Sequence, residues 1–247
     1  CSSDLSDSQR LTWGWDSFKD YTKHHTRFFL LHRQDDGYDN GELTPGELLD
    51  RLAKMIRSKL AGQGVIRTIG TNENLIRLRI DDAPHHSAKA IGTPPAEFAT
   101  QSNRMSPAGI PMFYGAFDYQ TAHAETYDPQ LHVGKVISAG TFQPVRPLVI
   151  LDLANLPPMP SVFDPSGRPL IHSLRFLNAF AKDISSPIAR DGKEHIEYVP
   201  TQIVTEYFRR VFRLDEAVQL DGLAYRSSKN LGGVAFVLFC LLPGHFP

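Results

Sequence analysis

Residues 102–126, SNRMSPAGIPMFYGAFDYQTAHAET, gather side chains that could do chemistry. Arg104 lies in the polar, turn-rich beginning, Tyr114 lies in a strand-like piece, and Glu125 lies near the end of a helix predicted to start at Asp118. A strand-to-helix turn can aim the phenol and the carboxylate into one cleft. The alternative places Tyr114 in the core and Glu125 on a helix surface, and composition alone favours this alternative.

Two further segments carry arginines and hydroxyls. In LIRLRI at 75–80 the apolar side chains alternate with Arg77 and Arg79, so both arginines lie on one face of a predicted strand and need acidic or phosphate partners. In DGLAYRSSKN at 221–230, Ser227 and Ser228 follow a short predicted strand. Hydroxyls at a strand end can hydrogen-bond a sugar or a phosphate, and they can equally well close a turn.

The string RFFLLH places Arg27 and His32 at the Arg-x4-His spacing of the HEPN ribonucleases, in which arginine stabilises phosphate charge and histidine moves a proton. On a helix, residues at this spacing face directions that differ by about 140°. A packing or surface role for His32 is the alternative, and it is the one we expect.

Metal-binding patterns are weak. The loop DDGYDNGELTPGE resembles a calcium loop from Asp36 onwards, but Tyr38 stands where a carboxylate is required, so we expect an acidic loop that leads into a capped helix. His85 and His86 lie beside a proline in a polar stretch that reads as a loop. The motifs of Rossmann, P-loop, zincin and α/β-hydrolase proteins do not occur in the sequence. We therefore expect no metal.

The composition narrows the class of protein. The 247 residues include 26 basic and 27 acidic side chains, and a net charge of −1 argues against nucleic acid as the main partner while leaving room for a local basic pocket. The longest apolar stretch, 234–242, is about half the length of a membrane helix, so a buried strand is expected there.

The cysteines and the start of the chain bear on its location. Cys1 and Cys240 form neither a disulfide framework nor a metal spacing, which favours a reducing compartment. The polar, acidic beginning lacks a signal peptide, so we expect a cytoplasmic location. Because the chain opens on Cys1 and not on methionine, we expect it to be a processed or excised piece of something longer.

The elements that must position these residues predict an α+β fold. Residues 9–61 are predicted to form a helical hairpin of 13–33 and a second helix, which starts at a Thr44-Pro45-x-Glu47 capping box and stops at Gly62. Short β-rich pieces follow from Val65, with predicted helices at 118–125, 170–182 and 201–212. We therefore divide the chain into a helical region, 1–70, and an α+β domain, 71–247.

Several of these pieces together resemble the RES-domain family, named for an arginine, a glutamate and a serine, over about residues 72–240. LIRLRI is similar to the opening strand and puts Arg77 at the motif arginine. SNRMSPAGIPMFYGA is similar to a Gly-Arg-Trp-Asn-Pro-x-Gly segment and its strand, which carries over Arg104 and Tyr114. TAHAE is similar to Thr-Ala-x-x-Glu and makes Glu125 the motif glutamate. YVPTQ is similar to a Tyr-x-x-Thr-Gln segment, and DGLAYRSS makes Ser227 the motif serine.

The chain departs from the family pattern at two places. Ile76 stands where tyrosine usually precedes the motif arginine, and Asn103, Met105 and Ser106 surround Arg104 in the second segment. These changes alter the shape and aromatic lining of a pocket and leave its charged groups in place. The N-terminal FKDYTKHHTRFF resembles the helical HEPN-type extension that some RES proteins carry.

The resemblance implies an ADP-ribosyltransferase-like fold with a mixed β core and flanking helices. It also implies a toxin that takes NAD⁺ as a substrate, without a further cofactor, and breaks its nicotinamide–ribose bond by hydrolysis or phosphorolysis. Glu125, Arg77 and Ser227 would be catalytic. Arg77, Arg104, Tyr114 and Ser227 would bind the dinucleotide, with the arginines on its pyrophosphate and Tyr114 stacked on nicotinamide.

Other functions stay open at this level. The same fold could transfer ADP-ribose to a protein or nucleotide, act as a HEPN-type ribonuclease through Arg27 and His32, or hold NAD⁺ without turnover. An enzyme that destroys NAD⁺ in a growing cell must be inhibited or triggered, so we expect a protein partner. The sequence leaves open the acceptor, the identity of the partner and the number of copies that assemble.

Overall fold

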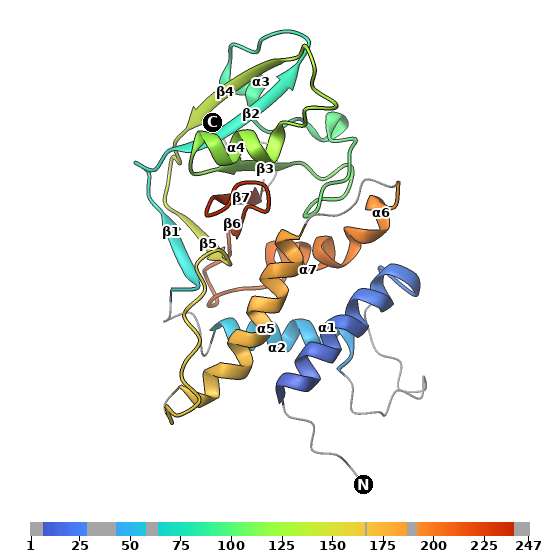
Figure 1. Cartoon of the computed structure of the whole chain (residues 1–247), viewed down its shortest axis with the longest axis vertical. Helices are drawn as coiled ribbons and strands as arrows, with labels where there is room; N and C mark the ends of the chain where they lie inside the picture. Colours follow the sequence, from blue (N-terminus) through green and yellow to red (C-terminus); the bar gives the residue numbers. More distant parts are fainter. Residues whose placement is uncertain (1–6, 29–42, 58–63, 166, 187–191, 240–247) are drawn as a thin grey trace.

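The computed structural model describes residues 7–28, 43–57, 64–165, 167–186 and 192–239. These residues form one mixed seven-stranded sheet with flanking helices, in agreement with the predicted α+β class (Figure 1). The strand order is β1-β5-β6-β7-β3-β2-β4. The strands are β1 (Ile66–Ile69), β2 (Leu75–Asp81), β3 (Met112–Ala116), β4 (Val136–Phe142), β5 (Leu148–Asp152), β6 (Gly222–Arg226) and β7 (Val234–Phe239). The helices are α1 (Asp7–His24), α2 (Pro45–Met55), α3 (Ala88–Ile91), the 3₁₀ turn η3 (Ala96–Phe98), α4 (Tyr119–Thr126), α5 (Arg168–Ser185), α6 (Glu194–Glu197) and α7 (Val199–Arg210).

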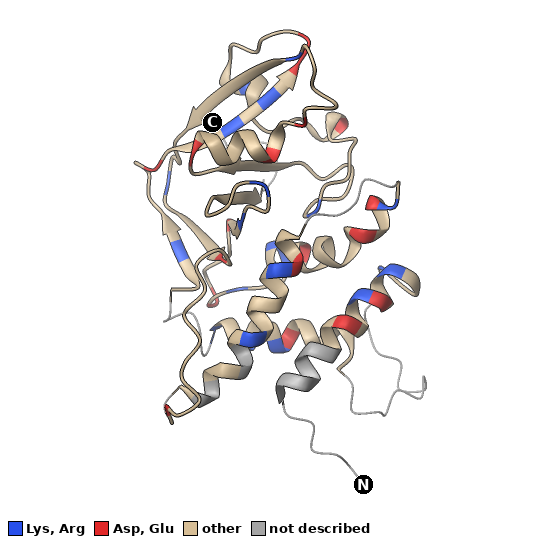
Figure 2. Cartoon of the chain, in the orientation of Figure 1, with Lys and Arg blue, Asp and Glu red and all other residues tan. Residues whose placement is uncertain are grey.

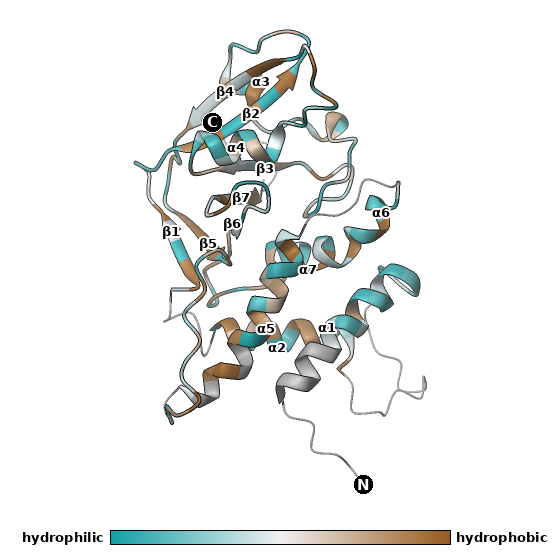
Figure 3. Cartoon of the chain, in the orientation of Figure 1, coloured by the Kyte–Doolittle hydropathy of each residue, from teal (hydrophilic) through white to brown (hydrophobic). Residues whose placement is uncertain are grey.

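Most of the predicted elements are present, with shifted ends. β2 is the predicted alternating strand, and hydrophilic and hydrophobic residues alternate along it in Figure 3. β4 begins at Val136, because a turn with Gly134 at a φ of 73° precedes it. β5 begins after Pro147, whose ring nitrogen cannot donate to a sheet ladder. Pro200 occupies the first turn of α7, where proline is favoured, so this helix starts at Val199.

The helical hairpin is partly as predicted. Thr44 and Glu47 form the expected capping box at the start of α2. The prediction that the first helix extends from residue 13 to 33 is wrong at its end, because α1 stops at His24. The N–H groups of His25 and Thr26 both donate to the carbonyl of Tyr21, which closes the last turn. The predicted stop at Gly62 lies outside the described residues.

The centre of the sheet consists of β6, β7 and β3, which pair antiparallel. Tyr225 of β6 lies opposite Ala235 of β7, and Ala235 lies opposite Ala116 of β3. Side chains of one cross-strand row lie on the same face of a sheet, so Tyr225 shares its face with Ala116. Tyr114 precedes Ala116 by two residues in β3 and therefore lies on that face as well. α4 packs over Ala116 through Ala122, whereas Tyr114 and Tyr225 pack against the large core cluster.

The large core cluster joins the N-terminal helices to the sheet. It contains Phe18 of α1, Leu52 of α2, Phe180 of α5, Phe208 of α7 and Val237 of β7, all buried. β1 also lies within residues 1–70 and pairs with β5, so this region contributes a strand as well as helices. The division at residue 70 stays a prediction.

Charges of both signs are interspersed along the described part of α1 in the view of Figure 2. This distribution accompanies the near-zero net charge of the sequence. None of the helices in the described part of the chain combines the length and the apolar character that crossing a bilayer requires.

Candidate functional site

A glutamate and a serine that lie far apart in the sequence meet beside the central strands. Asp118 caps the start of α4 by accepting hydrogen bonds from the backbone N–H and the hydroxyl of Thr121, and Glu125 lies in the last turn of the helix. Ser227 directly follows β6. Its hydroxyl donates to Oε1 of Glu125 at 2.5 Å, a short charge-assisted hydrogen bond. We call these two residues the Glu125–Ser227 pair.

The turn after β6 holds Ser227 in place. The backbone N–H groups of Lys229 and Asn230 donate to the Ser227 hydroxyl at 3.1 and 3.0 Å. The ammonium of Lys229 donates to the Glu125 carbonyl, and the amide of Asn230 donates to Thr121. Ser227 therefore closes a turn, which is one of the two roles that the sequence left open, and it also binds the Glu125 carboxylate. Its binding of a sugar or a phosphate stays a prediction.

Tyr114 is partly buried on the face of the sheet that also carries Tyr225. Its phenol and the hydroxyl of Ser106 share a hydrogen bond of 2.8 Å. Burial raises the pKa of Tyr114 to about 12, with hydrogen bonds from Ser106 and Met105 and the charge of Arg77 acting in the opposite direction. Tyr114 is therefore a neutral phenol at ordinary pH.

Arg104 enters the site from a loop that is held by two helices. Its Nη1 donates to the carbonyls of Asp183 and Ile184 at the end of α5, where a cation is favoured. Helix α7 fixes the loop, because the Thr201 hydroxyl donates to the Arg104 carbonyl and the Gln202 amide donates to the carbonyl of Asn103. The Thr-Gln segment thus holds the Arg104 segment through two backbone carbonyls.

The guanidinium of Arg104 faces the polar groups of the site. Burial lowers its pKa, and the surrounding phenols together with Glu125 act in the opposite direction. No hydrogen bond from Nε or Nη2 to the described residues is present, so two of its three nitrogens remain for a ligand. An arginine keeps its charge in such a place because its pKa in water is above about 12.

Arg77 has partners that differ from the predicted ones. Its Nε donates to the carbonyl of Ile91 and its Nη1 to the carbonyl of Tyr114, while the guanidinium lies 5.2 Å from the ring centre of Phe113. The ladder between β2 and β3 contains the single pair Ile76–Ala116 within the described strands, so Arg77 bridges them where they diverge. Backbone carbonyls thus accept from Arg77, whereas Arg79 on the same strand has the predicted acidic partner, with its Nε 3.8 Å from Oδ2 of Asp81.

A hollow of about 250 Å³ lies between these diverging strands and the 94–111 loop. Its lining includes Arg77, Phe98, Gln101, Asn103, Ser106 and Tyr114. Glu125, Arg104 and Ser227 lie outside this lining. Tyr114 therefore borders the hollow and, through its electrostatic contact with Arg104, also belongs to the surroundings of the Glu125–Ser227 pair.

Tyr198 and Tyr225 belong to the same surroundings and were not among the predicted site residues. Burial raises the pKa of Tyr225, and the nearby Glu125 and Tyr114 raise it further. Tyr198 raises the pKa of both Arg104 and Tyr114 through its charge interaction with them. The signal was present in the sequence, because Tyr225 precedes Ser227 by two residues, the spacing that puts two strand residues on one face.

The other patterns lie away from this site. Arg27 follows the end of α1 and donates to the Lys23 carbonyl, so it is not on a helix, and His32 lies outside the described residues. The calcium-like residues from Asp36 to Asn40 also lie outside them, while Glu47 serves the capping box. His85 binds Asp81 through its ring and Ser138 through its backbone. Within the described ranges, no group of three or more potential ligands could hold a metal ion.

Comparison with known proteins gives one match. The model of the RES domain matches residues 76–246, a segment that contains Arg77, Arg104, Tyr114 and the Glu125–Ser227 pair. No curated protein and no solved structure matches the chain.

Proposed function

Because the chain belongs to the RES domain family, whose members are associated with NAD-related toxin function, we propose that it degrades NAD⁺ by cleaving the nicotinamide–ribose bond. The hydrogen-bonded Glu125–Ser227 pair is the observation that carries this proposal. Hydrolysis and phosphorolysis fit this chemistry equally well. The ADP-ribosyltransferase-like fold, a toxin or defence role in the cytoplasm, and a restraining or activating protein partner are parts of the same proposal.

Glu125 is the group best suited to stabilise the transition state. Nicotinamide leaves as a neutral molecule from a cationic pyridinium, so positive charge moves onto the ribose as the bond breaks. A carboxylate beside that ribose lowers the energy of this charge. Ser227 occupies Oε1 of Glu125, whereas Oε2 accepts no hydrogen bond from the described residues and remains for a sugar hydroxyl or an incoming nucleophile.

The two arginines, Arg77 and Arg104, and the hollow are suited to the pyrophosphate and the nicotinamide ring of NAD⁺. Arg104 offers Nε and Nη2 as a planar fork for the pyrophosphate. Arg77 lines the hollow, which is large enough for one planar ring with its neighbouring groups. Tyr114 borders the hollow and can stack on nicotinamide. Ser227 can hold a ribose hydroxyl or phosphate in addition to Glu125.

The decisive experiment is a time course of NAD⁺ incubated with purified protein, with and without inorganic phosphate, and with all products identified. We expect release of nicotinamide together with ADP-ribose or its 1-phosphate. Glu125→Ala and Glu125→Gln should abolish the release while the variants stay folded and bind NAD⁺ in calorimetry. Glu216→Gln, in an exposed loop, is the matched control and should behave as the wild type.

Two results would redirect or contradict the proposal. ADP-ribose found on a protein or nucleotide would show that the acceptor is a macromolecule, and mass spectrometry of a protein mixture tests this. RNA cleavage that survives Glu125→Ala and is lost in His32→Ala would identify a HEPN-type ribonuclease. If NAD⁺ is neither bound nor cleaved under any condition, the chain is not an NAD⁺-degrading enzyme.

A further inference from the structure

The position of Tyr225 on the sheet places its side chain beside the Glu125–Ser227 pair. Leu223, Tyr225 and Ser227 alternate with residues of the opposite face along β6 and its extension. The row through Tyr225 contains only Ala235 and Ala116 on the next two strands. These two small side chains leave the phenol room on this face, between α4 and the core cluster under α5 and α7.

The hydroxyl of Tyr225 has no hydrogen-bond partner within the described part of the chain. Phenols in buried surroundings ordinarily find one, because an unsatisfied hydroxyl costs free energy. A phenol that finds no hydrogen-bond partner among the described residues, beside the charged groups of the site, is placed to hydrogen-bond a ligand.

The neighbours of Tyr225 define what its hydroxyl can recognise. The charges of Glu125 and Arg104 and the phenol of Tyr114 all influence the pKa of Tyr225, so Tyr225 lies in the electrostatic surroundings of the carboxylate and the cation of the site. The raised pKa keeps the phenol neutral and able to donate. A neutral donor holds a sugar oxygen without placing a second full positive charge beside a ribose that becomes cationic.

We propose that the Tyr225 hydroxyl donates a hydrogen bond to a hydroxyl of the nicotinamide-bearing ribose, and that this sugar hydroxyl in turn donates a hydrogen bond to Glu125. This inference rests on the proposed NAD⁺-cleaving function. The sugar hydroxyl then lies between an acceptor and a donor, which fixes the rotation of the ribose at the carbon that loses nicotinamide. Tyr225 is thus a substrate-binding residue that was not among the predicted site residues.

The test combines Tyr225→Phe with NAD⁺ and with two analogues that lack the 2′- or the 3′-hydroxyl of the nicotinamide ribose. On NAD⁺ we expect kcat/KM to fall about tenfold, the effect of one lost hydrogen bond. On the analogue that lacks the contacted hydroxyl, the substitution should have no further effect. A merely structural role would lower the rate on all three substrates by the same factor.

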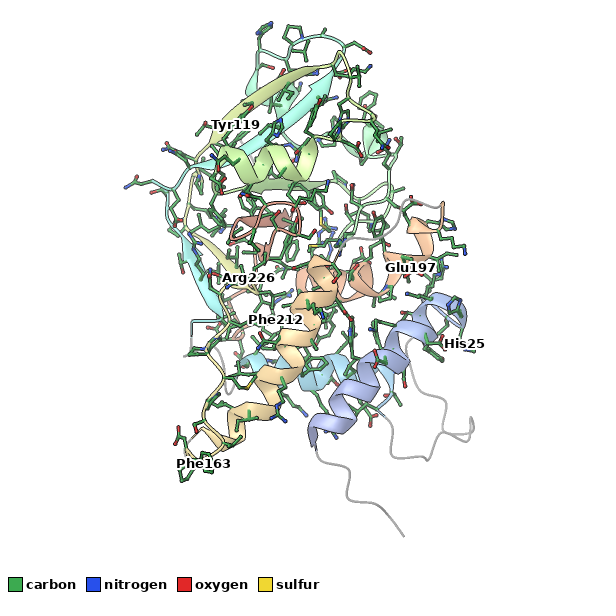
Figure 4. All side chains as sticks on the ribbon, in the orientation of Figure 1. His25, Tyr119, Phe163, Glu197, Phe212 and Arg226 are labelled. Atoms are coloured by element: carbon green, nitrogen blue, oxygen red, sulfur yellow. The ribbon has the colours of Figure 1, made fainter. Side chains whose placement is uncertain are left out.

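Tyr119→Phe is the matched control, because Tyr119 lies at the start of α4 and is 50% exposed (Figure 4). It should leave kcat/KM unchanged on every substrate, and both variants should melt at the wild-type temperature. Equal activity of Tyr225→Phe and wild type on NAD⁺, or an equal loss on NAD⁺ and both analogues, would overturn the inference. If the wild type cleaves no NAD⁺, the proposed function fails, and Kd values for the same substrates decide whether Tyr225 binds the ribose hydroxyl.

Discussion

Replacing Ser227 with alanine tests the central interaction of the site. The substitution removes the 2.5 Å hydrogen bond to Oε1 of Glu125 and leaves the carboxylate free to rotate. A hydrogen bond to a charged group contributes about 1.5–3 kcal/mol, so the loss corresponds to about a 10- to 150-fold decrease in kcat/KM for nicotinamide release. Only the part of this energy that orients Glu125 in the transition state appears in kcat.

The same substitution has a smaller effect on stability. Ser227 is buried, but the two N–H groups that it accepts belong to a turn in which Lys229 is exposed, so water can replace the hydroxyl there. We expect the free energy of unfolding to fall by about 1 kcal/mol, measured by urea denaturation. Activity should therefore fall by much more than the unfolded fraction rises.

Ser228→Ala is the control for this prediction, because Ser228 is the exposed neighbour in the same turn. It should change neither kcat/KM nor the denaturation midpoint. A Ser227→Ala enzyme with kcat/KM within about twofold of the wild type would refute the role of the pair, since that change is only about 0.4 kcal/mol. A loss of activity that matches the unfolded fraction would equally refute it, because the serine would then be structural.

Three further predictions concern the surroundings of the pair. Thr201→Val removes the hydrogen bond to the Arg104 carbonyl and should raise KM for NAD⁺ by about three- to tenfold with a smaller change in kcat, because it loosens the loop that carries the guanidinium. Phe98→Ala should raise KM by about the same factor if the hollow takes a planar ring, whereas Phe163→Ala, at another exposed phenylalanine outside the lining of the hollow, should leave KM unchanged (Figure 4). The raised pKa of Tyr114, about 12 in the folded state, makes its neutral form favour folding. Its contribution is fully present below about pH 10 and is lost as the pH rises towards 12, by about 2–3 kcal/mol, so Tyr114→Phe should flatten the fall in urea midpoint across this window.

Local rules predicted the elements where the signal lies within a few neighbouring residues. The alternation in LIRLRI predicted β2, and the capping residues Thr44, Glu47 and Asp118 predicted where α2 and α4 begin. The end of α1 escaped prediction, because apolar residues continue to Leu31 in the sequence while backbone hydrogen bonds close the helix at Tyr21. β1 lies where β-rich pieces were expected from Val65, but within the residues assigned to the helical region, 1–70. This four-residue strand is stabilised by its pairing with β5 more than by its own pattern.

The sequence motifs identified side chains but not their partners. Arg77 was expected to need an acid or a phosphate, and the structure gives it the carbonyls of Ile91 and Tyr114 because two strands diverge beside it. Arg104 was expected to bind pyrophosphate, and the structure additionally ties one of its nitrogens to the end of α5. The catalytic and binding roles assigned to these residues stay predictions.

The sequence by itself determined the residue types available for chemistry, the α+β class and the family resemblance, because these depend on composition, short spacings and the order of motifs. Only the tertiary structure decided that Glu125 and Ser227 share a hydrogen bond, since 102 residues of intervening chain separate them. Local alternation puts Tyr225 on the same face as Ser227, and the pairing of β6 with β7 and β3 brings both to the face that carries Tyr114. The physical reason is that a hydrogen bond depends on separation in space, which the register of a sheet sets and local periodicity does not.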